Sequence, residues 1–358
     1  MSLHFHRLTV KAISKETADC VSVQFDVPAS LEKEFAFSQG QSLTLRTSIN
    51  GEEVRRNYSI CSSPLENKLR VAIKKVDGGL FSSYANEQLK PGDVLEVMPP
   101  VGKFNTTLHP DQQKNYFAFA AGSGITPVIS LIKTTLATEK HSRFTLVFGN
   151  RNRGSVIFFE ELESLKNQYM ERFSLVHILS RERTDTELNF GRIDAGKLEE
   201  LNRLEAFSGV DEFFICGPEE MIFTVKDFLE KKGIGKKSIH FELFNTSGRQ
   251  QSTVHIPQTA ATGPVSKISV KVDGRSFDVE IPLNSNTSIL DAALQQGADL
   301  PFACKGGMCC TCKAKLLEGE VSMDVHWGLE DEEVAKGYIL TCQSHPKTEK
   351  VVVDFDAK

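Results

Sequence analysis

Four cysteines near the C-terminus have the spacing of metal ligands. Cys304, Cys309 and Cys312 form the pattern C-x4-C-x2-C, and Cys342 follows after a gap. Four thiolates are what a [2Fe–2S] cluster requires, and such a cluster moves one electron at a time. The glycines at 306–307 let the loop fold back, so that sulfurs and backbone N–H groups converge on one small cluster. We therefore predict that these four cysteines ligate a [2Fe–2S] cluster.

A zinc site and a set of disulfides are the alternatives for these cysteines. A zinc site would usually draw on two C-x2-4-C pairs, and Cys342 has no cysteine near it. Disulfides need an oxidising compartment, whereas the polar N-terminus lacks a secretory h-region and predicts a cytoplasmic protein. Cys310 does not fit the ligand spacing, and in a strand-like run its side chain would point away from Cys309, so we expect it to pack. Cys20 and Cys61 are also expected to be packing residues.

A second candidate site is the run Arg56-Asn57-Tyr58-Ser59 in the N-terminal third. An arginine can hold a phosphate through two hydrogen bonds. A tyrosine two residues along a strand shares the arginine's face and can pack on a flat ring. The turn from Gly79 to Ser82 follows a predicted strand, and a glycine with a hydroxyl in a tight turn suits a pyrophosphate. An ordinary strand and turn would account for the same residues.

A third group of residues predicts a nucleotide site. The run Gly122-Ser-Gly124-Ile-Thr126-Pro127 falls between a predicted strand and a predicted helix, where backbone N–H groups meet a phosphate. It is not G-x-G-x-x-G, so the usual dinucleotide fingerprint is not met. Ser180 and Arg181 follow another strand, and a hydroxyl with a guanidinium there suits the 2′-phosphate of NADP. An exposed polar turn is the alternative.

Two further strand ends belong to this predicted site. Asn150 and Arg151 follow a strand and have a weaker claim to the same phosphate or to the ribose. Cys216, Gly217 and Pro218 end the next predicted strand, where Cys216 could border a nicotinamide. A nucleophilic role for Cys216 is also possible, although no base is evident beside it.

The elements that must position these residues fall into three segments. Residues 1–105 are β-rich with turn signals between short apolar runs, which predicts a barrel. From residue 116 strands alternate with helices, which predicts a parallel, doubly wound sheet. Residues 246–266 have linker composition, and strands resume at 267. The predicted strands are 6–13, 20–27, 42–47, 68–76, 94–98, 116–121, 144–149, 173–179 and 213–216, and the predicted helices are 127–135, 156–168, 218–231 and 289–294.

Composition and charge exclude some classes of protein. The chain has 358 residues, 40% hydrophobic and 25% charged, and no apolar run approaches the length of a membrane span. A net charge of −5 argues against a nucleic-acid partner. The whole excess lies in residues 267–358, which hold 10 basic and 15 acidic residues. This acidic segment, with its run at 330–333, could steer docking to a basic partner, although a solvated helix face accounts for the run equally well.

Taken in order, these motifs resemble the ferredoxin–NADP reductase superfamily with a plant-type ferredoxin domain fused at the C-terminus. The resemblance covers nearly the whole chain, and RRNYSICSS, AGSGITPVIS, VFGNR, FICGPEEMI and HFELFNT are most similar to oxygenase reductase subunits of the phenylacetyl-CoA epoxidase type. Reductases of steroid monooxygenases and Rieske oxygenases are also similar. The resemblance implies an FAD-binding barrel at 1–105, an NADP(H)-binding α/β domain at 106–245 and a β-grasp [2Fe–2S] domain at 267–358.

The resemblance also implies roles for single residues. Ser59, Cys216 and Glu242 are the implied catalytic residues, and Phe244 approaches the flavin ring with Glu242. The implied FAD-binding residues are Arg56, Asn57, Tyr58, Ser59, Ile73, Val76, Gly79, Leu80 and Ser82. The implied NADP(H)-binding residues are Gly122, Gly124, Thr126, Pro127, Asn150, Arg151, Ser180, Arg181, Cys216, Gly217 and Pro218. FMN in place of FAD and NADH in place of NADPH stay open.

The function expected from this arrangement is electron transfer. NADPH gives two electrons as hydride, the cluster takes one, and a flavin between them can split the pair. The expected partner is the oxygenase component of a multicomponent monooxygenase, with a di-iron phenylacetyl-CoA epoxidase favoured. The alternatives are a reductase of another oxygenase or desaturase and a non-catalytic redox sensor.

Overall fold

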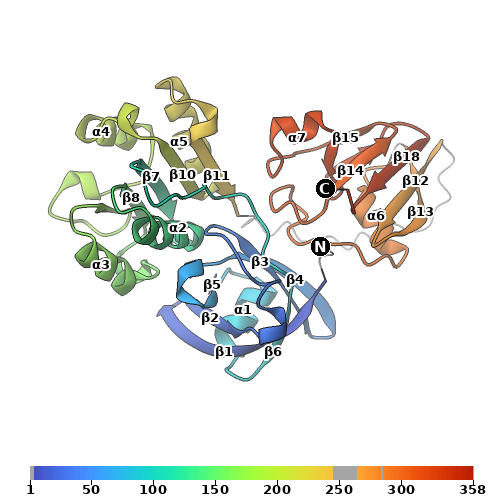
Figure 1. Ribbon diagram of the computed structural model, residues 1–358, viewed down its shortest axis with the longest axis horizontal. Helices are drawn as coiled ribbons and strands as arrows, with labels where there is room; N and C mark the ends of the chain where they lie inside the picture. The colour runs from blue at the N-terminus through green and yellow to red at the C-terminus, as the bar shows by residue number, and fades with distance from the viewer. Residues whose placement is uncertain (1–3, 245–263, 284, 358) are drawn as a thin grey trace. The chain divides into compact units, whose positions relative to one another are not determined.

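The computed structural model describes residues 4–244, 264–283 and 285–357 (Figure 1). The chain divides into two compact units. One unit holds His6–Val54 and the described residues from Tyr58 to 244. The other holds the described residues from 264 onward, together with His4, Phe5 and Arg55–Asn57. Most of the predicted linker, 246–266, lies outside the described residues, and a strand already begins at Val265.

The first half of the larger unit is an antiparallel barrel. Its six strands lie in the order β4-β3-β6-β1-β2-β5, and a bridge between Ile60 and Val71 joins the end of β4 to β5. Leu8, Val23, Leu43 and Leu95 are among the side chains that fill the interior. The strands are β1 (His6–Thr17), β2 (Cys20–Asp26), β3 (Ser42–Ile49), β4 (Glu52–Ser59), β5 (Leu69–Lys74) and β6 (Val94–Val97).

Short helices complete the barrel, and one of them corrects a prediction. The segment from Gly79 to Ser82 is not a simple tight turn, because Gly79 is the N-cap of helix α1 (Leu80–Glu87). Phe81 and Ala85 are buried on one side of α1, and this apolar face provides the drive for helix formation that the turn prediction overlooked. The 3-10 turns η1 (Ala29–Leu31) and η2 (Pro64–Glu66) lie in the connections β2–β3 and β4–β5.

The second half of the larger unit is a parallel five-stranded sheet in the order β11-β10-β7-β8-β9. In Figure 1, α2 and α3 lie on one side of the sheet and α4 and α5 on the other. The strands are β7 (Asn115–Ala121), β8 (Arg143–Asn150), β9 (Phe173–Leu179), β10 (Glu212–Gly217) and β11 (Ile239–Leu243). The helices are α2 (Ile125–Thr138), α3 (Phe159–Gln168), α4 (Ala195–Leu204) and α5 (Glu219–Lys231).

The strand order of this sheet defines where a ligand should bind. The chain runs outward from β7 to β8 and β9, then crosses to β10 on the other side of β7 and ends in β11. Ligands of such sheets bind beyond the carboxyl ends of the strands at the point where the order reverses. That point lies between β7 and β10, where the predicted turns at 122–127 and 216–218 begin.

The doubly wound prediction is confirmed, with differences at the element ends. The strand 173–179 has the predicted bounds, whereas the helix predicted from 156 begins at Phe159. Pro127 is the third residue of α2, not the first, and Pro218 is the N-cap of α5. Gly233, with a φ of +85°, follows the end of α5 as expected for a C-terminal glycine.

The C-terminal unit has the expected β-grasp architecture. A five-stranded mixed sheet has the order β13-β12-β18-β14-β16, with β12 and β18 parallel. Helix α6 (Ile289–Gln295) begins after the N-cap Ser288, whose side chain accepts from Asp291 N, and packs Ile289 and Leu290 into the core. The other elements are β12 (Val265–Val272), β13 (Arg275–Pro282), β14 (Lys313–Glu318), β15 (Val321–Met323), α7 (Asp331–Ala335), β16 (Tyr338–Leu340), β17 (Ser344–Pro346) and β18 (Lys350–Asp354).

Candidate functional site

The four predicted ligand cysteines come together in the C-terminal unit. Cys304 and Cys309 lie on the loop between α6 and β14, Cys312 ends that loop, and Cys342 lies between β16 and β17. Cys304 lies close enough to Cys309 for the two thiols to affect each other's ionisation, and so does Cys312 to Cys342. This arrangement in two pairs fits a cluster of two irons with two thiolates each.

Backbone N–H groups of the loop favour the thiolate of Cys304, whereas the hydrogen bond with the partner sulfur and burial raise the pKa of Cys309 and of Cys312. The N–H of Gly306 donates to the Cys304 sulfur at 3.3 Å. The hydrogen bond from the Cys309 thiol lowers the pKa of Cys304 to about 6 against the effect of burial, with help from the N–H groups of Gly306 and Met308. Thiolates are the form that binds metal. The donor set therefore fits a [2Fe–2S] cluster held by these four residues.

The arrangement of the thiols in two pairs differs from the single convergent group that a mononuclear metal site requires. Among the residues that the structure describes, no three His, Cys, Asp or Glu side chains converge to hold a single metal ion. The zinc alternative needs such convergence. No disulfide joins any of the eight cysteines, all of which lie in the described ranges, so the disulfide alternative is not seen either.

The non-ligand cysteine in the loop has a different setting from the one predicted. Cys310 is not in a strand, because its φ is +54°, in the left-handed region. Its thiol donates to the carbonyl oxygen of Gly328, which fixes the loop to the segment before α7. The prediction placed Cys310 in a strand-like run, and this part of the prediction is wrong. Cys20 and Cys61 are buried, as expected.

One residue that sequence reasoning missed ties the ligand segments together. The side-chain amide of Gln343 donates to the carbonyl oxygens of Lys305 at 2.8 Å and of Cys342 at 3.1 Å. It thereby holds the loop against the strand end that carries the fourth ligand. Its position directly after Cys342 is the sequence signal that could have indicated it.

The predicted flavin residues follow β4 and the start of α1. Arg56 is exposed, Asn57 and Tyr58 are half-buried, and Ser59 is buried at the end of the strand. The ring of Tyr58 lies 5.6 Å from that of Phe81, so the tyrosine is beside the first turn of α1. That helix has no side-chain N-cap, which leaves its first N–H groups for an anion. A flat ring with a phosphate tail fits this arrangement.

Four of the predicted flavin residues have other surroundings. The side chain of Ile73 is fully buried in the barrel interior, whereas Val76 and Leu80 are exposed. Ser82 is engaged locally, because its hydroxyl donates to Gly79 O and accepts from Val76 N. Contacts of these side chains with a flavin stay predictions.

The nucleotide turn lies at the switch point of the sheet. Gly122 has a φ of +54°, and a Cβ there would meet nothing within 4 Å, so the space beside it is open. Gly124 is required for another reason, since its Cβ would lie 2.0 Å from the carbonyl oxygen of Cys216. Thr126 is buried and donates to Ser123 O at 3.0 Å. The turn therefore packs against the end of β10 and leaves its backbone open to a ligand.

The ends of β8 and β9 complete this edge. The side-chain nitrogen of Asn150 is buried without a hydrogen-bond partner among the described residues, as expected where a ligand oxygen would bind. Ser180 lies beside it and donates to Asn150 O at 3.3 Å. Arg151 and Arg181 are exposed. Glu182 accepts from Arg153 N at 2.8 Å, so this carboxylate is turned toward the protein backbone.

The three predicted catalytic residues are brought together from distant segments. Ser59 donates to Glu242 Oε2 at 3.0 Å, across 183 positions of sequence. Glu242 pairs in register with Cys216 in the neighbouring strand. Burial raises the pKa of Glu242 to about 7, although the hydrogen bond from Ser59 lowers it. Burial also raises the pKa of Cys216, so its thiol is neutral and the nucleophile alternative loses support.

Phe244 and Pro218 lie at the edges of this group. Phe244 is half-buried against the interior of the α/β half, and Pro218 is exposed. Gly217 is buried between Ala121 and Met221. Their contacts with a cofactor stay predictions.

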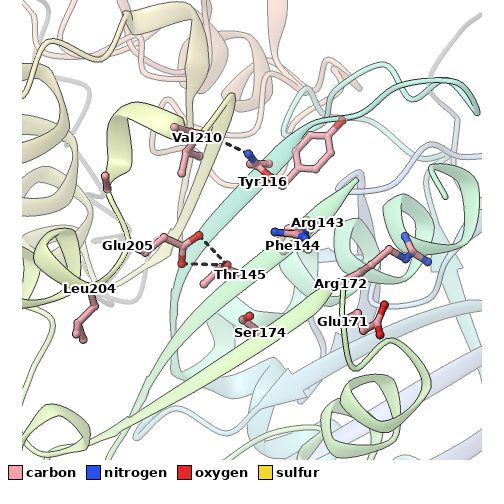
Figure 2. Close-up of a pocket in the computed structure, with 13 residues that line it drawn as sticks. Tyr116, Arg143, Phe144, Thr145, Glu171, Arg172, Ser174, Leu204, Glu205 and Val210 are labelled. Carbon is pink, nitrogen blue, oxygen red and sulfur yellow. Dashed lines mark hydrogen bonds between the residues drawn. The ribbon is translucent and has the colours of Figure 1, made fainter. Parts of the chain in front are cut away.

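A cavity of about 450 Å³ lies elsewhere in the α/β half. It opens at the amino ends of β7, β8 and β9 and is lined by Arg143, Thr145 and Glu205, among others (Figure 2). The hydroxyl of Thr145 lies 3.3 and 3.4 Å from the two carboxylate oxygens of Glu205. No predicted site residue lines this cavity, and it is at the edge of the sheet opposite to the ligand-binding edge.

Comparison with known families agrees with this division. Residues 7–106 match the oxidoreductase FAD-binding domain, residues 119–227 the oxidoreductase NAD-binding domain, and residues 270–347 the 2Fe-2S iron-sulfur cluster binding domain. Among the described residues, no helix is long and apolar enough to cross a membrane.

Individual relatives match over nearly the full length. One subunit of the 1,2-phenylacetyl-CoA epoxidase of Escherichia coli K12 is 48% identical over 357 residues, 99% of this chain and 98% of the relative. The ferredoxin reductase component of the 3-ketosteroid-9-alpha-monooxygenase of Rhodococcus rhodochrous is 35% identical over 97% of this chain and 96% of its own length. The structure of phthalate dioxygenase reductase matches with a TM-score of 0.57 and 26% identity over 98% of both chains.

Each feature of the site lies in the segment of the matching family. The open nucleotide turn lies in the NAD-binding segment, the uncapped helix beside Tyr58 in the FAD-binding segment, and the paired thiols in the 2Fe-2S segment. The chain belongs to the family of ferredoxin reductase-type oxidoreductases that carry FAD-binding, NAD-binding and [2Fe–2S] domains and serve as reductase components of oxygenases.

Proposed function

We propose that this protein passes electrons from NADPH to the oxygenase component of a multicomponent monooxygenase, and that this component is a di-iron enzyme that epoxidises phenylacetyl-CoA. The observation that carries the proposal is the 48% identity, over 99% of the chain, to a subunit of a 1,2-phenylacetyl-CoA epoxidase. None of the eight cysteines, all of which lie in the described residues, forms a disulfide, which suits the reducing conditions of the cytoplasm, where we place the protein.

The bound groups supply the redox chemistry, because FAD exchanges two electrons with a nicotinamide and single electrons with a [2Fe–2S] cluster. The residues of this chain bind and orient them. Arg56 and the first turn of α1 would hold the pyrophosphate of FAD, and Tyr58 would pack on its ring system. Cys304, Cys309, Cys312 and Cys342 would ligate the cluster.

Ser59, Glu242 and Cys216 are proposed to act on hydride transfer. A nicotinamide gains positive charge as it gives up its hydride, and a partly buried carboxylate favours that charge more than water does. Ser59 holds Glu242 in place through the 3.0 Å hydrogen bond. The neutral thiol of Cys216, fixed at the end of β10, would border the nicotinamide without reacting.

The preference for NADPH is proposed from the residues at the ends of β8 and β9. An enzyme specific for NAD commonly places a carboxylate there to bind the ribose hydroxyls. Here the guanidinium groups of Arg151 and Arg181 are exposed, and the hydroxyl of Ser180, which now donates to Asn150 O, can turn to a ligand, while Glu182 binds a backbone N–H. Two cations and a hydroxyl favour a 2′-phosphate.

Arg181→Ala tests this preference. We expect kcat/KM for NADPH to fall about 10- to 100-fold, the value of one charge-assisted hydrogen bond, and kcat/KM for NADH to change less than about twofold. Arg183→Ala is the matched control, because Arg183 pairs with Glu187 at 3.6 Å and lies over the Phe190 ring. Equal losses with both nucleotides would rule out the 2′-phosphate role.

The acceptor is tested by reconstitution. The purified full chain should show flavin and [2Fe–2S] absorption that NADPH bleaches. It should support NADPH-dependent epoxidation of phenylacetyl-CoA when mixed with the oxygenase component of that system. Matched assays with a steroid hydroxylase and a glycine betaine monooxygenase component test the alternatives that the 35% and 33% identical relatives suggest. A bleached spectrum without turnover in any assay would favour a redox sensor.

A further inference from the structure

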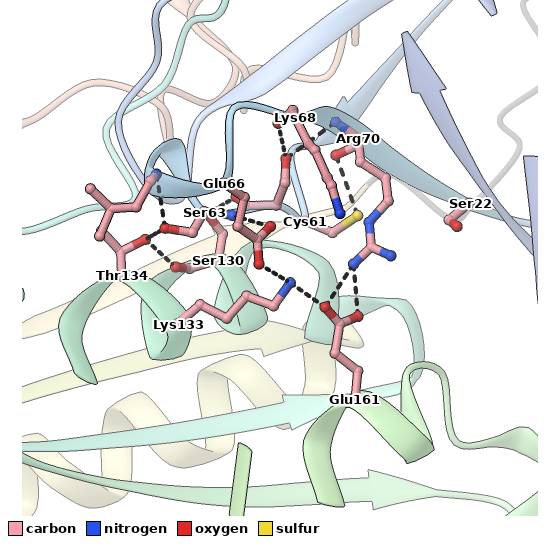
Figure 3. A network of polar contacts seen from close by, with 12 residues as sticks. Ser22, Cys61, Ser63, Glu66, Lys68, Arg70, Ser130, Lys133, Thr134 and Glu161 are labelled. Atoms are coloured by element: carbon pink, nitrogen blue, oxygen red, sulfur yellow. Dashed lines mark hydrogen bonds and ion pairs between the residues drawn. The ribbon is translucent and has the colours of Figure 1, made fainter. Parts of the chain in front are cut away.

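Four charged side chains join the barrel to the α/β half of the larger unit (Figure 3). Glu66 and Arg70 belong to the barrel, and Lys133 and Glu161 to helices α2 and α3. Lys133 Nζ lies 3.0 Å from Glu66 Oε1, and it also contacts Glu161. Arg70 Nη2 lies 3.0 and 2.7 Å from the two oxygens of Glu161. We call these four residues the charge cluster; each barrel member pairs across the boundary.

The burial of Lys133 makes the cluster specific. Only 6% of its side chain is exposed, and both of its carboxylate partners lie outside α2. A buried ammonium group is tolerated only where anions surround it, so the two carboxylates have to be in place. Burial alone would raise the pKa of Glu161, but the charges of Lys133 and Arg70 hold it below its usual value. Glu161 is therefore ionised at neutral pH.

Uncharged hydrogen bonds run alongside the charge cluster. Ser63 Oγ and Thr134 Oγ1 are 2.9 Å apart, and Ser130 Oγ donates to the carbonyl oxygen of Ser62 at 2.7 Å. Residues 130, 133 and 134 share one face of α2, and that face meets the segment after β4. Buried polar pairs contribute little net stability but allow few alternative registers.

The two connected segments are the ones that lead to the cofactor sites. Ser62 and Ser63 follow Ser59 by three and four residues. Lys133 lies seven residues after Thr126 on the same helix, about 10 Å along its axis. A helix is rigid over this length, so a shift at Lys133 moves the nucleotide turn with respect to the flavin strand.

We propose that Lys133 is a positioning residue for hydride transfer, which acts through the charge cluster to fix the distance between the flavin-binding strand and the nucleotide turn. The proposal rests on the reductase activity and not on the identity of the oxygenase. Hydride transfer needs reacting atoms about 3–3.5 Å apart, and a displacement of about 1 Å can cost about 100-fold in rate. Cofactor binding depends on contacts within each half and should be affected less.

Lys133→Met removes the charge and keeps most of the packing volume. In stopped-flow reduction by the better of NADPH and NADH, we expect the limiting rate of flavin reduction to fall at least about 10-fold. Flavin content, flavin midpoint potential, cluster absorption and the dissociation constant of the nucleotide should stay within about twofold. Lys133→Arg should restore most of the rate. No oxygenase is present, so failure of the proposed partner has no effect on the result.

Lys197→Met is the matched control. Lys197 is 9% exposed, but its partners, Glu200 at 2.8 Å and the carbonyl oxygen of Glu187 at 2.9 Å, all lie within the α/β half. This variant removes a buried cation without touching the boundary, and its limiting rate should equal that of the unaltered protein. A wild-type rate in Lys133→Met, or equal slowing in both variants, would overturn the proposal.

Glu66→Gln covers the case in which Lys133→Met does not fold. The side chain of Glu66 is 34% exposed and accepts a hydrogen bond from Ser63 N at 3.1 Å. The amide oxygen of a glutamine at this position can still accept from Ser63 N. We expect a two- to fivefold slowing of flavin reduction, about the value of one weakened charge pair at the boundary, with flavin content and nucleotide affinity unchanged. A rate equal to that of the unaltered protein would contradict a positioning role for the cluster.

Discussion

The cluster loop and the hydride site are built in opposite ways. Three of the four predicted cluster ligands lie within nine residues of one loop, and the segment of the fourth is held to that loop by Gln343. The proposed hydride site is assembled from Ser59, Cys216 and Glu242, which come from β4, β10 and β11. A local site depends on every ligand of its loop, whereas an assembled site depends on how whole elements pack. The first should fail completely when one residue is lost, and the second by degrees.

The largest effect is expected at the loop. Cys309→Ala should abolish the [2Fe–2S] absorption and electron transfer to one-electron acceptors that need the cluster, because a two-iron cluster requires all four thiolates. NADPH-dependent reduction of ferricyanide through the flavin should stay within about threefold. Absorption spectra, iron content and the two assays measure this.

Cys310→Ala is the control for that prediction. Cys310 adjoins Cys309, but its thiol donates to Gly328 O and so has a partner of its own. The cluster should remain in this variant. Cys309→Ala could instead keep a cluster, and the double variant Cys309→Ala/Cys310→Ala could then lose it. That result would mean that Cys310 replaces Cys309 as a ligand, and it would contradict the contrast between the two sites.

The assembled site should lose rate by degrees. Glu242→Gln should slow flavin reduction about 10- to 100-fold, because the carboxylate charge is lost but the position and most contacts remain. The raised pKa of Glu242, about 7, places its ionisation near neutral pH. The limiting rate in the unaltered protein should therefore rise with pH through about 7.

In Glu242→Gln the limiting rate of flavin reduction should no longer depend on pH near 7. A stopped-flow pH series on the variant and the unaltered protein measures both the slower rate and the lost pH dependence. Ser59→Ala is a milder companion that leaves the carboxylate in place, and it should move the inflection upward because the hydrogen bond from Ser59 lowers the pKa. An inflection that survives Glu242→Gln would assign the ionisation to another group.

The same contrast explains what the sequence could predict. The cysteine spacing predicts the cluster site because the ligands are local, and the apolar strand 173–179 is predicted to the residue because a buried parallel strand is a short apolar run. Helix α1 was missed because its first three residues were interpreted as part of a tight turn at 79–82. The charge cluster was missed because Lys133 and Glu161 look like ordinary surface charges, and their partners in the barrel, Glu66 and Arg70, lie 67 and 91 positions away.

The smallest expected effect concerns stability. Replacing each of two carboxylates of the larger unit, Glu242 and Glu212, by glutamine should change the stability at pH 8.5 in opposite directions. The pKa of Glu242 in the folded protein, about 7, is above its ordinary value of 4.5, so the folded state binds the extra proton. The stability from this group is complete below about pH 4.5 and is lost as the pH rises through about 7. Glu242→Gln cannot ionise and should be more stable than the unaltered protein at pH 8.5 by about 1–2 kcal/mol, with no gain at pH 5.

Glu212 should behave in the opposite way. Burial would raise its pKa, but hydrogen bonds with His240, Lys114 and Thr106 lower it to about 2. Its contribution is present above about pH 4.5 and is lost as the pH falls toward 2. Glu212→Gln should therefore be less stable at pH 8.5 by about 1–3 kcal/mol, since the hydrogen bonds with charged groups are weakened. Urea unfolding followed by flavin fluorescence at pH 5 and 8.5 measures both variants. If the free energy of unfolding at pH 8.5 rises in Glu242→Gln and falls in Glu212→Gln, the proposed hydride site holds its carboxylate at a cost in stability. If it falls in both variants, Glu242 is an ordinary structural carboxylate.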